Sequence, residues 1–247
     1  MAAVTLLATQ GLSRRFGGVV AVDGVDFELA RGETRAIIGP NGAGKTTLVG
    51  MVCGRLAASS GRVVFEGRDI TRSSRWDRVK RGIVYTFQIT SIFGSLSCFD
   101  NVALAAQRSL SWARGDWWPR GHGHLDRDVA AALDRVGLAA RSGDRAGSLS
   151  YGHQRLLEVA IGLALRPTLL ILDEPTQGLA EDEIVDFCDL VRGVSKDATV
   201  LLIEHNMPVV MDLADRITVM DNGRILAEGS PAEIRADPQV QKAYLGA

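Results

Sequence analysis

The sequence has little cysteine, no strong excess of either charge and no long apolar segment. Its three cysteines, Cys53, Cys98 and Cys188, are odd in number and lack metal-site spacing, so we expect reduced thiols in a cytosolic protein. The formal net charge is −1, so no overall basic field favours nucleic acid as a partner. No window approaches the roughly 18 apolar residues of a membrane span, and Met1–Gln10 has no basic n-region and no apolar run of signal length. We therefore expect a protein that is soluble by itself but able to dock onto a membrane protein.

What the sequence does contain is a glycine-rich segment, residues 39–47, that fits the pattern G-x-x-x-x-G-K-[ST]. Before it, Thr34–Ile38 predicts a strand, and after it Leu48, Val52 and Leu56 fall on one helical face. A strand, a glycine-rich turn and a helix form a phosphate cradle, because backbone N–H groups and the helix N-terminus face the phosphates. The predicted cradle consists of Gly39, Pro40, Asn41, Gly42, Ala43, Gly44, Lys45, Thr46 and Thr47. We therefore predict that the chain binds a nucleoside triphosphate, with Lys45 reaching the β- and γ-phosphates and Thr46 offering its hydroxyl to Mg²⁺.

A second segment with candidate functional residues is the apolar run that ends in Asp173 and Glu174. A continuous apolar run is typical of a strand buried on both faces of a parallel sheet. At the carboxyl end of such a strand, Asp173 is placed to hold Mg²⁺ and Glu174 to orient and deprotonate an attacking water. An acidic turn without function is the alternative, and the complete phosphate cradle in the same chain makes it the weaker one.

The pattern along the chain predicts three regions. Short β-rich segments at 4–7, 25–29 and 63–65 surround the phosphate cradle. Helical spacing dominates from about residue 87 to 164. Within it, we interpret Trp112–His124 as a loop whose aromatic residues lie against their own subdomain rather than as a patch for a partner or lipid headgroups. His122 and His124 alone are weak evidence for a metal.

The α/β pattern returns after Pro167. It predicts a helix from Glu181 to Val191, a buried strand from Thr199 to Ile203 and a hairpin around Asp221–Gly223. The spacing of Ser230 and Glu233, with proline between them, predicts a helix that begins with a capping box.

Residues 149–154, Leu-Ser-Tyr-Gly-His-Gln, resemble the signature motif of ATP-binding cassette (ABC) ATPases, whose common form is Leu-Ser-Gly-Gly-Gln. Other segments match the family in order and spacing over nearly the whole chain. By this resemblance Phe16 stacks on adenine, Gln88 senses Mg²⁺ and the membrane partner, residues 177–180 form the D-loop, and His205 is the switch histidine. Ser150 and Gly152 belong to the signature that caps ATP bound to another subunit.

The resemblance implies an α/β fold, namely a P-loop NTPase cassette with a RecA-like α/β core, an antiparallel β-subdomain and a helical subdomain. We expect a single ABC ATPase domain over residues 1–247. Its parts are a nucleotide-binding β-rich part with the phosphate cradle at 1–87, a helical subdomain with the signature at 88–164, and the remaining core with a C-terminal hairpin and helices at 165–247. The implied cofactors are ATP and Mg²⁺. The implied catalytic residues are Glu174, His205, Gln88 and Lys45, and the implied Mg²⁺ site is formed by Thr46, Gln88 and Asp173.

Within this family, the sequence resembles the ATP-binding subunits of branched-chain amino acid importers. The residues that suggest this are the segment 202–207, Tyr151 and the segment 243–246. This implies an ATPase on the cytoplasmic face of the membrane, held there by transmembrane permease subunits. It also implies a second ATP-binding subunit, identical or related, and an extracytoplasmic solute-binding protein, with no nucleic acid. The alternatives are a soluble ABC ATPase of translation or DNA repair, a P-loop kinase and a catalytically silent cassette.

Two positions depart from the family pattern. His153 replaces the usual signature glutamine, although Gln154 follows, and its imidazole can still donate a hydrogen bond. Ala180 stands where the D-loop usually has an aspartate, which puts signalling between subunits through this position in doubt. We expect nucleotide binding and hydrolysis to survive the loss of that carboxylate.

Overall fold

The computed structural model describes residues 4–86, 91–114 and 122–245. Its centre is a six-stranded sheet in the order β10-β9-β3-β8-β7-β6. The strands are β3 (Thr34–Ile38), β6 (Ile83–Thr86), β7 (Leu169–Asp173), β8 (Thr199–Ile203), β9 (Arg216–Asp221) and β10 (Arg224–Gly229). All neighbouring pairs are parallel except β9 and β10, which form the predicted hairpin. The α/β class predicted from the sequence is therefore correct.

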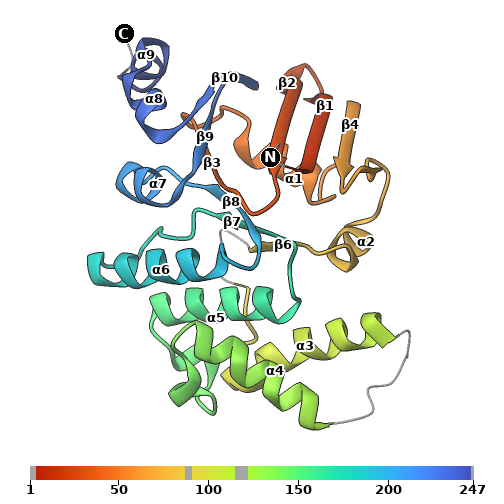
Figure 1. Cartoon of the computed structure of the whole chain (residues 1–247), viewed down its shortest axis with the longest axis vertical. Helices are drawn as coiled ribbons and strands as arrows, with labels where there is room; N and C mark the ends of the chain where they lie inside the picture. Colours follow the sequence, from red (N-terminus) through yellow and green to blue (C-terminus); the bar gives the residue numbers. More distant parts are fainter. Residues whose placement is uncertain (1–3, 87–90, 115–121, 246–247) are drawn as a thin grey trace.

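A second sheet, antiparallel throughout, has the order β2-β1-β4-β5. Its strands are β1 (Thr5–Phe16), β2 (Val19–Ala30), β4 (Ser60–Phe65) and β5 (Arg68–Asp69). The strands β1 and β2 are longer than the sequence predicted, because bulges in their pairing interrupt the simple alternation of apolar and polar residues. In Figure 1 this sheet stands beside the upper part of the six-stranded sheet, with α1 (Lys45–Val52) nearby.

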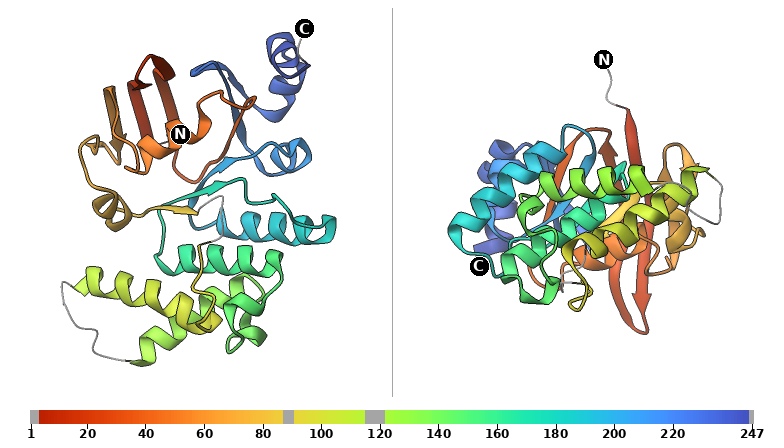
Figure 2. Two further views of the ribbon diagram at one scale, coloured as in Figure 1. Left: turned by 180° about the vertical axis from the view of Figure 1, so that it is seen from behind. Right: turned by 90° about the horizontal axis from the view of Figure 1, so that it is seen from below.

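The described helices after α1 are α2 (Arg75–Lys80), α3 (Cys98–Arg114), α4 (His122–Arg135), α5 (Tyr151–Ala164), α6 (Glu181–Val194), α7 (Met207–Leu213), α8 (Pro231–Ala236) and α9 (Pro238–Leu245). In Figure 1 and the left view of Figure 2, α3, α4, α5 and α6 form the lower part of the molecule, whereas α8 and α9 lie at the top, near β10. The capping box predicted for α8 is confirmed, since Ser230 accepts from the N–H of Glu233 and Glu233 accepts from the N–H of Ser230. None of the helices in the described ranges is long and apolar enough to cross a membrane.

The loop predicted over Trp112–His124 is wrong at both ends. α3 continues to Arg114 and α4 begins at His122, because neither glycine nor proline interrupts the chain between Cys98 and Arg114. Trp117 and Trp118, which we interpret as lying against their own subdomain, are outside the described residues.

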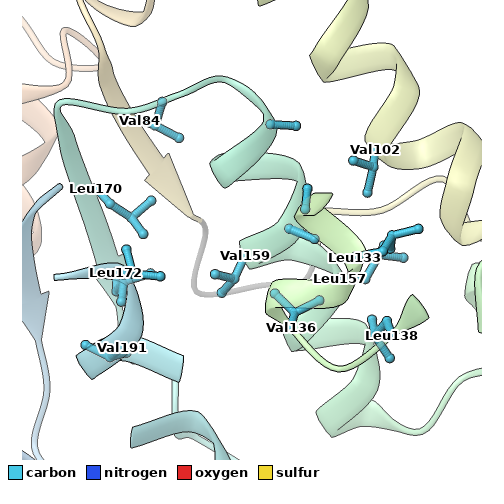
Figure 3. Close-up of a cluster of buried hydrophobic side chains, with 14 of the residues drawn as sticks. Val84, Val102, Leu133, Val136, Leu138, Leu157, Val159, Leu170, Leu172 and Val191 are labelled. Carbon is cyan, nitrogen blue, oxygen red and sulfur yellow. The ribbon is translucent and has the colours of Figure 1, made fainter. Parts of the chain in front are cut away.

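Successive side chains of the central strands belong alternately to two hydrophobic cores, one on each face of the sheet. Leu169 and Ile171 of β7 pack with α1 and the antiparallel sheet, whereas Leu170 and Leu172 pack with the helices. Figure 3 shows Leu170 and Leu172 facing Val159 of α5. Because both faces of β7 are covered, its register is fixed. This fixes Asp173 at the carboxyl end of the strand.

Candidate active site

The segments predicted to carry the chemistry follow the carboxyl ends of adjacent strands. β3, β8, β7 and β6 are parallel neighbours. The glycine-rich loop follows β3, Asp173 ends β7, and His205 comes two residues after β8. Carboxyl ends of parallel strands meet at one edge of a sheet, where ligands bind in open α/β folds. Gln88, which comes after β6 in the sequence, lies outside the described residues.

Two glycines let the loop pack closely against other backbone. At Gly39, φ is 151° and a Cβ would lie 2.1 Å from the carbonyl oxygen of Met220. At Gly44, φ is 98° and a Cβ would lie 2.4 Å from the carbonyl oxygen of Ala21. Only glycine fits both positions. Asn41 and Gly42 in the middle of the loop are exposed, and α1 begins directly after Gly44 with its first N–H groups and positive dipole end at the loop.

Lys45 folds back over this loop. Its Nζ donates to the carbonyl oxygens of Gly39 at 2.7 Å and of Pro40 at 3.0 Å. Partial burial lowers the pKa of the ammonium, while the carboxylates of Glu174 and Asp173 act in the opposite direction. The cation therefore lies within electrostatic reach of both carboxylates, at a loop whose backbone suits an anion. A phosphate group is the ligand that matches this combination.

Asp173 is a carboxylate buried to 2% exposure. Burial raises the pKa of its carboxyl, and the hydroxyl of Tyr85, which donates to Oδ2 at 2.5 Å, acts to lower it. The guanidinium of Arg55 lies 4.8 Å from the centre of the Tyr85 ring. Tyr85 was not identified from the sequence, because a tyrosine in an apolar strand is typical of core packing.

Glu174 has a left-handed backbone, with φ of 47°. Its N–H donates to the carbonyl oxygen of Ile203 at 2.8 Å, which ties the turn after β7 to the end of β8. Positive φ is uncommon for residues other than glycine, and such conformations are concentrated at functional sites. The strain is held by the neighbouring strand, so the position of Glu174 is set by tertiary structure.

Glu204 is a second residue that sequence analysis did not single out as functional. It is 1% exposed. Its Oε1 accepts from the N–H of Thr176 at 3.0 Å and from the Thr176 hydroxyl. Its Oε2 accepts from the N–H groups of His205 at 2.8 Å and Asn206 at 3.0 Å. One carboxylate therefore joins the segment after Glu174 to the segment that carries His205.

The signature segment lies at the start of α5. Ser150 caps this helix, since its Oγ accepts from the N–H of His153 at 3.3 Å and lies 2.8 Å from His153 Nδ1. A Cβ on the buried Gly152 would lie 2.2 Å from Oε1 of Glu183, which belongs to α6. Figures 1 and 2 show α5 in the lower, helical part and α1 beside the upper sheets. A single chain thus does not bring Ser150 and Gly152 together with the loop at Lys45.

Two further predicted positions lie outside this group. Phe16 ends β1 and is 44% exposed, and the guanidinium of Arg14 lies 4.6 Å from its ring centre. The Arg14 guanidinium therefore lies over one face of the ring. Ala180 precedes α6, and its N–H donates to Oε2 of Glu183 at 3.0 Å, so the helix start is capped without an aspartate at this position.

Comparisons with known proteins agree over nearly the whole chain. Residues 22–177 match the family model described as ABC transporter, and residues 224–247 match the model described as branched-chain amino acid ATP-binding cassette transporter. The chain is 37% identical over 250 residues to the high-affinity branched-chain amino acid transport ATP-binding protein LivG of Salmonella typhimurium, covering 98% of both chains. It is 36% identical to BraF of Pseudomonas aeruginosa, a transport ATP-binding protein of the same description, again over 98% of both.

A solved structure gives the same result for the fold. The crystal structure of the ADP conformation of MJ1267, an ATP-binding cassette of an ABC transporter, superposes with a TM-score of 0.86 at 31% identity. The alignment covers 99% of this chain and 100% of that one.

Proposed function

Because the chain belongs to the ABC transporter family of ATP-binding cassettes, we propose that it hydrolyses ATP to power a membrane importer of branched-chain amino acids or a similar small polar solute. The observation that carries the proposal is the meeting of the Lys45 loop, Asp173, Glu174 and the His205 segment at one sheet edge. Relatives aligned over 98% of both chains are transport proteins, which disfavours a soluble ATPase of translation or DNA repair.

In this function each residue has a distinct role. The loop 39–47 and the start of α1 hold the phosphates, and Lys45 compensates their charge. Glu174 orients the attacking water and removes its proton. His205 and Gln88 complete the surroundings of the γ-phosphate, and Phe16 stacks on adenine. These roles follow from the resemblance and from where the described residues lie.

The donor set near the loop suits Mg²⁺. Thr46 offers a hydroxyl oxygen and Asp173 a carboxylate oxygen, and hard oxygen ligands are those that Mg²⁺ prefers. Burial raises the pKa of Asp173, so a charged Asp173 is costly without a nearby cation. Thr46, Asp173 and Gln88 would hold the ion. When bound, it would neutralise charge on the β- and γ-phosphates.

The assembly in this proposal contains two ATP-binding subunits, identical or related. Ser150 and Gly152 of one subunit close the site formed by the loop of the other. The pair is held by transmembrane permease subunits on the cytoplasmic face of the membrane, and an extracytoplasmic binding protein delivers the solute. The opening and closing movements of the two ATP-binding subunits are transmitted to the permease through the region around Gln88.

The test is to purify the tagged chain from its native membranes in mild detergent and identify its partners by mass spectrometry. Two multi-span proteins, with or without a second ATPase, are the expected partners. Uptake of labelled leucine by cells lacking the chain should return with the wild type and fail with Glu174→Gln. Capture of soluble partners alone, such as ribosomes, would leave an ATPase without the transport role.

A further inference from the structure

The Glu204 carboxylate lies in a position that the roles above do not use. Its side chain is fully buried, at 0% exposure, while the His205 side chain beside it is 62% exposed. Each oxygen of the carboxylate serves a different segment: Oε1 accepts from Thr176, and Oε2 accepts from the N–H groups of His205 and Asn206. Thr176 is two residues after Glu174. The Glu204 carboxylate therefore links the segment that follows Glu174 to the segment that carries His205, and Glu174 and His205 are the two proposed hydrolytic residues.

The chemistry of the site requires a carboxylate. Four donors face two oxygens, and an ionised carboxylate has acceptor capacity for all four. A glutamine of the same shape would turn an NH₂ group toward the donors of one segment, so that segment would have to move. The second tie between the segments, the bond from the N–H of Glu174 to Ile203, is backbone only. This bond holds the ends of β7 and β8 together, but the position of His205 depends on its hydrogen bond to Glu204.

The ring of His205 is also within the field of this carboxylate. Its Nδ1 lies 3.9 Å from Glu204 Oε2. On the same side, Oε2 accepts from the backbone N–H groups of His205 and Asn206. Burial keeps water from competing with these bonds, so the arrangement is rigid before nucleotide arrives.

We propose that Glu204 is a positioning residue that fixes His205 relative to the turn carrying Glu174. The proposal rests on the proposed function, because it gives His205 a part in hydrolysis. Glu204 itself touches no substrate. Its effect passes through the backbone and ring of His205.

The experiment is a double-mutant cycle in the full chain. Turnover, ATP affinity and melting temperature are measured for wild type, Glu204→Gln, His205→Ala and the double variant. Glu204→Gln should lower turnover about 10- to 100-fold, as expected for a small displacement of a hydrolytic group, while ATP affinity stays at the wild-type value. In the His205→Ala background, the same substitution should have little further effect on turnover.

Two other variants complete the design. Thr176→Val removes one donor to Oε1 but keeps the backbone bond, and should give a smaller fall in turnover that also vanishes without His205, so it serves if Glu204→Gln does not fold. Glu233→Gln is the matched control. Glu233 also accepts from a backbone N–H, that of Ser230 at 2.7 Å, but it caps the peripheral helix α8, and turnover should not change.

Three results would overturn the proposal: wild-type turnover per folded Glu204→Gln molecule with only a lower melting temperature, additive losses in the cycle, or wild-type turnover for His205→Ala. A wild-type chain that binds but does not hydrolyse ATP would instead remove the proposed function. The two failures are therefore distinguishable.

Discussion

Glu174 is the residue whose replacement separates binding from chemistry. Glutamine keeps the size of the side chain and its tie to Ile203 but cannot accept a proton from water. We expect Glu174→Gln to lower the rate of ATP hydrolysis roughly 10²-fold or more and to leave ATP binding intact, because Lys45 and the loop are untouched. Turnover by phosphate release and affinity by a fluorescent nucleotide measure the two effects. Near-normal hydrolysis by the variant would remove Glu174 from the role of general base.

Asp173 is expected to destabilise the nucleotide-free protein. Burial raises the pKa of its carboxyl, so the folded state binds this proton more tightly than the unfolded chain, and stability falls as pH rises through that raised pKa. Asp173→Asn removes the charge and still accepts from Tyr85. It should raise the melting temperature by a few degrees near neutral pH, with a smaller gain as pH falls toward the raised pKa.

Differential scanning fluorimetry without nucleotide measures this effect. Asp186→Asn, on an exposed position of α6, is the control and should change the melting temperature much less. A lower melting temperature for Asp173→Asn at neutral pH would mean that contacts of the carboxylate outweigh its burial.

At the scale of elements, the contact between α5 and α6 depends on the absence of a side chain at Gly152. A Cβ there would lie 2.2 Å from Oε1 of Glu183, and that carboxylate caps the N–H of Ala180. Gly152→Ala should therefore displace Glu183 and cost about 0.5–2 kcal/mol of unfolding free energy, the usual value of a lost cap. In a Glu183→Ala background the same substitution should cost nothing, because alanine favours the helix and the obstacle is gone. Urea unfolding of the four proteins measures the coupling, and equal costs in both backgrounds would contradict the contact.

The elements also show what one sequence can predict. The loop at Lys45 was identified because the whole pattern lies within consecutive residues, and the strand ending in Asp173 was identified from its continuous apolar run. Tyr85 and Glu204 were not identified, because the contacts that place them at the site involve partners far along the chain. Tyr85 is 88 residues from Asp173, and Glu204 is 28 residues from Thr176. Strand order decides these pairs, and nothing local in the sequence specifies which strand lies beside which.

Helix boundaries failed for a related reason. The aromatic and glycine-rich composition of Trp112–His124 suggested a loop, but α3 and α4 extend into it from both sides. Composition averages over a window, whereas a helix ends only where a residue breaks it or its packing face ends.

The start of α5, by contrast, does not depend on which side chain stands at position 153. Ser150 Oγ accepts its N-cap hydrogen bond from the backbone N–H of His153, and a glutamine at this position would offer the same N–H.

At the scale of the whole molecule, the separation of α1 from α5 predicts that two chains share each ATP site. A mixture of two inactive variants tests this directly. Lys45→Ala disables the phosphate loop. Ser150→Asp keeps a good helix N-cap but places a negative charge where the proposed γ-phosphate would approach. Each variant alone should be nearly inactive. A mixed dimer contains one site with an intact loop and an intact signature, so an equal mixture should recover up to roughly a quarter of wild-type turnover, since half of random dimers are mixed and each has one of two sites.

The recovery should grow with the total protein concentration, because the mixed dimer forms by association. A mixture of Lys45→Ala with wild type is the control for simple dilution. If the two variants together are no more active than either alone at any concentration, the signature does not complete the site of a second identical chain, and the partner must be a different subunit. In that case the two subunits would have different D-loops facing each other across the dimer. That difference would explain why this chain has alanine rather than aspartate at position 180.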